Sequence, residues 1–167
     1  MNTKMTKDII PEGFTLGLAF VDALPVIFFA GSMFLIGKGF SSTLFMIGAL
    51  LCLAGGAGKV LWKIIVVTKK KNVWPLFVQM RILMSVGFLL MICSIAVNAD
   101  RMKFAEIIRS CTVFPSAGFF LAGILGMVLM TVSALCLDSS DVRANWTEQL
   151  INGLAQGAIF LGILFMK

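Results

Sequence analysis

The chain has 167 residues, of which 59% are hydrophobic and only 13% are charged, and its net charge is +6. A soluble domain is about 45–50% apolar and about 25% charged, so this composition excludes an ordinary water-soluble protein. Histidine is absent and the four cysteines lack zinc-binding spacing, so histidine-based catalysis is excluded and we predict no metal or cofactor site. The positive charge is explained by lysines that flank membrane spans, and we predict no nucleic-acid partner.

The first predicted span covers roughly residues 13–36, after a short polar segment. It is too long for the apolar part of a cleavable signal and is interrupted by Asp22, so we expect it to stay in the mature protein. Pro25 should kink the helix and free the carbonyl group near Val21. Ser41 or Ser42 can then cap the next helix.

The second predicted span covers roughly residues 43–67 and ends at the lysine run Lys69–Lys71. It carries Lys59 and Lys63, which lie one helical turn apart and therefore share a face. Three glycines precede them and predict either close helix packing or a local break in the span. These glycines are Gly55, Gly56 and Gly58.

The third predicted span covers roughly residues 74–97 and opens with Trp74 and a proline, which is well placed in a first helical turn. It contains Gln79 and Arg81, which lie about 200° apart on a helix, so both cannot point straight inward. The segment 98–112 is mixed in polarity, and it is either a short interfacial helix or a solvated loop. The apolar side of such a helix would include Met102, Phe104, Ala105 and Ile108.

The fourth predicted span, roughly residues 113–137, has no charged residue, and the last begins near residue 142 and runs to the C-terminus. Small residues recur at four-residue spacing in both spans, and they predict close helix contacts within the chain or between copies. They are Gly118, Ala122 and Gly126 in the fourth span and Gly153 and Gly157 in the fifth.

The fold class that follows is an all-α integral membrane bundle of five transmembrane helices, with residues 1–167 forming a single domain. The run Lys69–Lys71 should be cytoplasmic, which places the N-terminus on the same side and the C-terminus on the opposite side. The three tryptophans fall near the same boundary, as an interfacial aromatic belt would place them. They are Trp62, Trp74 and Trp146.

Charged residues inside the spans are the strongest functional signal. At about 1.5 Å per residue, Asp22, Lys59 and Arg81 all lie roughly 10–15 Å from the cytoplasmic end. A charge near the centre of a span costs at least about 2.5–3.5 kcal/mol, so we expect Asp22 to pair with Lys59 or Arg81. The predicted ligand-binding or ion-pair cluster comprises Asp22, Lys59, Lys63, Arg81, Glu148, Asn152 and Gln156, with Gln79 nearby.

Three functions remain open from the sequence. The bases of this cluster outnumber its acids, which favours a small anionic or polar solute, or a lipid headgroup, and hence a transporter or channel-like protein with a cytoplasm-facing polar cavity. The second hypothesis is a non-catalytic membrane subunit or assembly protein, including a homo-oligomer, in which the charges only lock helices together. The third is a membrane enzyme acting on a lipid headgroup, which is disfavoured because only Asp22 and Glu148 could act as acid or base.

Overall fold

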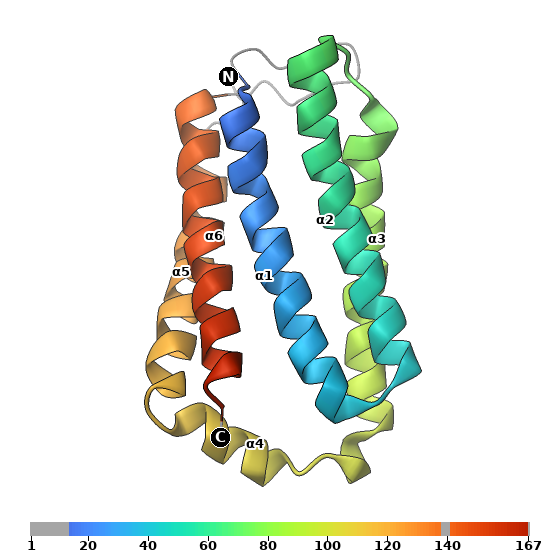
Figure 1. Cartoon of the computed structure of the whole chain (residues 1–167), viewed down its shortest axis with the longest axis vertical. Helices are drawn as coiled ribbons and strands as arrows, with labels where there is room; N and C mark the ends of the chain where they lie inside the picture. The colour runs from blue at the N-terminus through green and yellow to red at the C-terminus, as the bar shows by residue number, and fades with distance from the viewer. Residues whose placement is uncertain (1–13, 138–140, 167) are drawn as a thin grey trace.

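The computed structural model describes residues 14–137 and 141–166, and the polar N-terminal segment lies outside this part. Within it the chain is all-helical, with six α-helices and one 3-10 turn, and it contains no strand. The elements are α1 (Leu16–Phe40), α2 (Thr43–Lys69), α3 (Trp74–Val97), the 3-10 turn η1 (Ala99–Arg101), α4 (Phe104–Thr112), α5 (Ser116–Cys136) and α6 (Val142–Leu164) (Figure 1).

Four of the described helices are long and apolar enough to cross a bilayer, which makes the chain an integral, multi-pass membrane protein. They are α1, α2, α3 and α5, so the predicted number of five spans is not matched in full. The fifth long helix, α6, differs because its first half carries Arg143, Glu148 and Asn152 among other polar residues. The short α4 settles the choice for segment 98–112 in favour of a helix.

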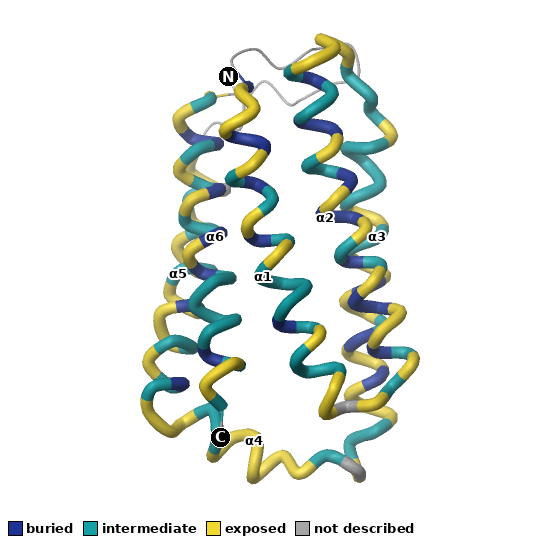
Figure 2. Tube along the Cα trace, in the orientation of Figure 1, coloured by how far each residue is buried: buried dark blue, intermediate teal, exposed yellow. Residues whose placement is uncertain are grey.

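Contacts link the long helices in the order α3, α2, α1, α6, α5, and we call this arrangement the row. In Figure 1, α1 is in the middle, α3 lies partly behind α2 and α5 lies partly behind α6. Two antiparallel hairpins, α2–α3 and α5–α6, pack against opposite sides of α1. The lysine end of the row is the end at which α1 and α6 begin and at which α2 ends with Lys69. The opposite end holds the turn between α1 and α2, the exposed helix α4 and the C-terminus (Figures 1 and 2).

The α2–α3 hairpin is held by a glycine contact that the sequence pattern did not single out. A Cβ atom on Gly48 would lie 2.6 Å from the carbonyl oxygen of Gly87, so the two backbones touch. Further along α2, Gly55 packs against Met84 of α3 while Gly56 packs against Val26 of α1. The glycine cluster therefore marks close packing on two sides, and α2 runs through it without a break.

The predicted small-residue stripes have a mixed outcome. Gly126 packs against Ala155 of α6, and Gly157 packs against the ring of Phe28 on α1, as expected for close helix contacts. In contrast, Gly118 and Ala122 are exposed on the outer side of α5. The face that α5 turns toward α6 instead uses Gly123, whose Cβ position would lie 2.5 Å from Ile159.

Helix α1 is continuous through Pro25, and its start is capped by Thr15, whose Oγ1 accepts a hydrogen bond from the Leu18 amide at 3.2 Å. Ser42 caps α2 in the same way, since its Oγ accepts from the Phe45 amide at 3.4 Å. The preceding residue, Ser41, takes a left-handed conformation with φ of 44°, which lets the chain turn sharply between the two helices.

Candidate charge cluster between α1 and α2

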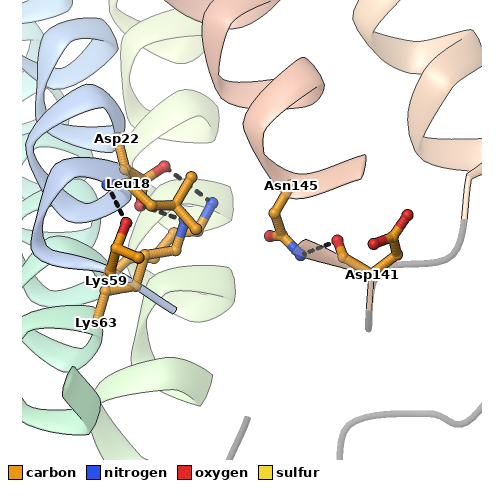
Figure 3. A network of polar contacts seen from close by, with 7 residues as sticks. Leu18, Asp22, Lys59, Lys63, Asp141 and Asn145 are labelled. Atoms are coloured by element: carbon orange, nitrogen blue, oxygen red, sulfur yellow. Dashed lines mark hydrogen bonds and ion pairs between the residues drawn. The ribbon is translucent and has the colours of Figure 1, made fainter. Parts of the chain in front are cut away.

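Asp22 of α1 lies between two lysines of α2 near the lysine end of the row. Its Oδ2 is 3.1 Å from Lys63 Nζ and its Oδ1 is 3.5 Å from Lys59 Nζ (Figure 3). Asp22 is 4% exposed and Lys63 is 2% exposed, whereas Lys59 is 27% exposed. One carboxylate therefore bridges a buried ammonium group and a more accessible one.

The sequence places these three groups together for simple geometric reasons. Lys59 and Lys63 are one turn apart, so both project from the side of α2 that faces α1. One turn from Lys59 toward the opposite end, Gly56 lets the Val26 side chain approach, since a Cβ atom there would lie 2.9 Å from Val26 Cγ2. The close approach of the two helices brings the short Asp22 side chain within reach of both lysines.

An aromatic cluster lies between this ion pair and the lysine end. Phe14, Leu18, Trp62 and Val66 form a buried apolar cluster, and Lys63 Nζ lies 5.6 Å from the centre of the Phe14 ring. Trp62 is 1% exposed and its Nε1 donates a hydrogen bond to Asn72 Oδ1 at 2.9 Å. Trp62 is therefore a packing residue inside the protein, which corrects its predicted place in an interfacial belt.

The buried half of the cluster has hydrogen-bonding capacity that the described residues do not use. Apart from their mutual contact, neither Lys63 Nζ nor Asp22 Oδ2 has a hydrogen-bond partner in residues 14–137 and 141–166. An ammonium group has three donors, so at least two of those on Lys63 remain uncommitted there. Burying such donors unpaired is costly, which makes this position chemically conspicuous.

Arg81 and Gln79 do not join the cluster. Arg81 is exposed on α3, and its guanidinium group lies 5.6 Å from the centre of the Phe77 ring. The Gln79 side chain lies directly over Gly58, where the missing Cβ makes room for it. The position of Arg81 in the sequence predicted its depth in the span but not the direction of its side chain around the α3 axis. In the structure that side chain points away from the cluster.

The polar residues of α6 divide between different neighbours. Glu148 lies near enough to Lys63 to add a favourable Coulomb interaction. Gln156 instead turns to α5, where its Nε2 lies 3.6 Å from the sulfur of Met127. Asn152 is half-buried on α6. The structure thus brings Asp22, Lys59 and Lys63 into contact, with Glu148 at a longer distance.

Two buried residues were missed by the sequence reasoning. Phe14 contributes the ring beside Lys63, but it precedes the helix and has no periodic signal. Gln149 of α6 is 5% exposed, and its Oε1 has no hydrogen-bond partner among the described residues. Glu148 and Gln149 are neighbouring polar residues in the sequence. Only the rotation of α6 in the structure shows that Gln149 is the buried one of the two.

Comparison with known proteins finds no matching family model, no matching curated protein and no matching solved structure. The function must therefore be argued from the arrangement of the residues themselves.

Proposed function

We propose that this chain is a small solute transporter or channel-like protein whose solute site is the cluster of Asp22, Lys59 and Lys63. In this proposal α6 is a fifth span, the chain acts as one domain, and the lysine end with the N-terminus faces the cytoplasm. The observation that carries the proposal is Lys63, an ammonium group at 2% exposure beside Asp22, whose other donors have no partner in the described part of the chain. Ionisable groups placed this deep in a span are usually functional because they are expensive to keep.

The charge balance of the cluster defines the class of solute. Without Arg81, two lysines are set against Asp22 and the more distant Glu148, so the site is close to electrically neutral. Such a site favours a small singly charged anion or a polar solute over a polyanion. The anion would take the place of the Asp22 carboxylate at the accessible Lys59, while Lys63 holds Asp22 beside it.

The experiment is a thermal-unfolding assay on the full chain in detergent, with acetate or nitrate as the probe anion and sulfate as the divalent comparison. An anion that binds the folded state raises the melting temperature with its concentration. We expect acetate or nitrate to raise the melting temperature of the wild type, and Lys59→Gln to abolish this rise. Lys38→Gln is the matched control, because Lys38 is an exposed lysine near the opposite end of α1.

Wild-type protein that neither acetate nor nitrate stabilises, or an anion effect that Lys59→Gln leaves intact, would contradict the proposed site. That result would favour the second candidate, a membrane subunit or self-associating protein. The observation behind this candidate is the open row of helices, in which α3 and α5 stand at the two ends (Figure 1). Such a row encloses a pathway only together with a second copy or another chain.

A further inference from the structure

Arg81 is a second conspicuous cation, separate from the proposed solute site. It lies in α3, two turns after Trp74, which is about 10 Å into the span at 1.5 Å per residue. Its side chain is exposed on the outer side of the α3 helix, and in the described residues it forms no ion pair. A guanidinium group at this depth is costly to expose to hydrocarbon, and contact with an anion at the headgroup level lowers that cost.

The direction of the Arg81 side chain shows where that anion lies. Its guanidinium group stacks over Phe77, one turn nearer the lysine end, so the side chain extends toward the membrane surface. Phe77 is itself fixed, because its ring centre lies 4.9 Å from that of Trp62 and 5.2 Å from that of Trp74. A guanidinium group has five N–H donors, and contact with the face of an aromatic ring leaves donors available for an anion.

The surrounding charge is positive without compensation. From residue 43 to residue 97, the hairpin formed by α2 and α3 contains no aspartate and no glutamate. Lys59 and Lys63 are matched by Asp22, whereas Lys69–Lys71 and Arg81 have no ion-pair partner in the part of the chain that the structure describes. Lys69–Lys71 are exposed at the lysine end, just before the start of the helix that carries Arg81.

We propose that the outer face of α3 at the lysine end binds the headgroup of an anionic phospholipid. Arg81 would hold the phosphate in a bidentate contact, Trp74 would sit beside the glycerol region, and Lys69–Lys71 would attract the negative headgroup. This site shares no residue with the Asp22 cluster. It adds a lipid partner that is independent of any solute.

The test is native mass spectrometry of the full chain in detergent, titrated with phosphatidylglycerol or with zwitterionic phosphatidylcholine. We expect phosphatidylglycerol to bind more tightly, and Arg81→Gln to weaken its binding about tenfold, which corresponds to about 1.4 kcal/mol. Arg81→Lys should fall between, because lysine keeps the charge but cannot form the bidentate contact. Lys38→Gln is the matched control, since Lys38 lies over the Phe34 ring at 4.8 Å near the opposite end.

Equal phosphatidylglycerol affinity in the wild type and Arg81→Gln would overturn the proposal, as would an equal loss in Lys38→Gln. Displacement of the lipid by millimolar inorganic phosphate would also overturn it, because the site would then recognise free phosphate. So would a copurifying acidic protein whose binding, unlike that of lipid, requires Arg81. The acetate or nitrate effect that depends on Lys59 should persist in Arg81→Gln, so failures of the two proposals are distinguishable.

Discussion

Replacing Asp22 by asparagine should destabilise the protein more than removing either of its lysine partners. The substitution leaves the Lys63 ammonium group buried at 2% exposure without its ion-pair partner. Breaking a buried ion pair by removing one partner costs about 3–5 kcal/mol in soluble proteins, and we expect a loss in that range. Lys63→Met should cost less, because Asp22 keeps Lys59 at 3.5 Å.

A double-mutant cycle separates the two contacts of Asp22. The double variant Asp22→Asn/Lys63→Met should recover much of the stability lost in Asp22→Asn, because it leaves no buried charge. The coupling of Asp22 with Lys59 should be only on the order of 1 kcal/mol, since this lysine is 27% exposed and can reach solvent. Coupling with Arg81 should be close to zero, because Arg81 lies on the outer side of α3.

The assay is reversible unfolding in mixed micelles, monitored by tryptophan fluorescence. Trp62 is a suitable probe because it is buried next to the charge cluster. Asp100→Asn is the matched control because Asp100 is exposed at the opposite end, and it should change the unfolding free energy by less than about 0.5 kcal/mol. An Asp22→Asn variant that loses less than about 1 kcal/mol would refute the reasoning. So would a double variant that is no more stable than Asp22→Asn.

Two further predictions concern packing and orientation. Gly48→Ala should lower the unfolding free energy by about 1–3 kcal/mol in the same assay, because its Cβ would meet the Gly87 carbonyl oxygen. Gly39→Ala is the control and should be neutral or stabilising, because no atom lies within 4 Å of its Cβ position. In a cysteine-free background, a cysteine replacing Lys70 should react with an impermeant reagent only from the cytoplasmic side, and one replacing Glu106 only from outside; the reverse pattern would invert the proposed orientation.

The positions of the helices along the chain could be predicted because hydropathy depends on residue type alone. The second and third predicted spans, 43–67 and 74–97, agree with α2 and α3 within two residues at each end. The first predicted span ends four residues early, because Gly37 and Lys38 read as a turn but continue α1 to Phe40. The fifth predicted span rested on the apolar second half of α6. Because the first half of α6 is polar, this helix is not among the four that are apolar enough to cross a bilayer.

The rotation of each helix could not be predicted, and it decides which residues meet. In a membrane both the protein interior and the lipid are apolar, so a helix has no strong hydrophobic face that indicates its orientation. Depth therefore suggested Lys59 or Arg81 as the partner of Asp22, whereas the structure pairs Asp22 with Lys59 and, at a shorter distance, with Lys63. The contact between Gly48 and Gly87 could not be predicted for the same reason, because nothing in either segment identifies its partner.

The central position of α1 has a consequence for the order in which the protein is assembled. As the chain is synthesised, α2 and α3 follow α1 directly and can cover one of its sides at once. The other side, with Gly31 and Phe28, is covered by α6, where Phe160 and Gly157 contact it, and α6 follows all the other described helices in the chain. Until α6 docks in parallel beside it, that side of α1 faces lipid. Although α1 precedes the other described helices in the chain, its packing stays incomplete until α6 has been made.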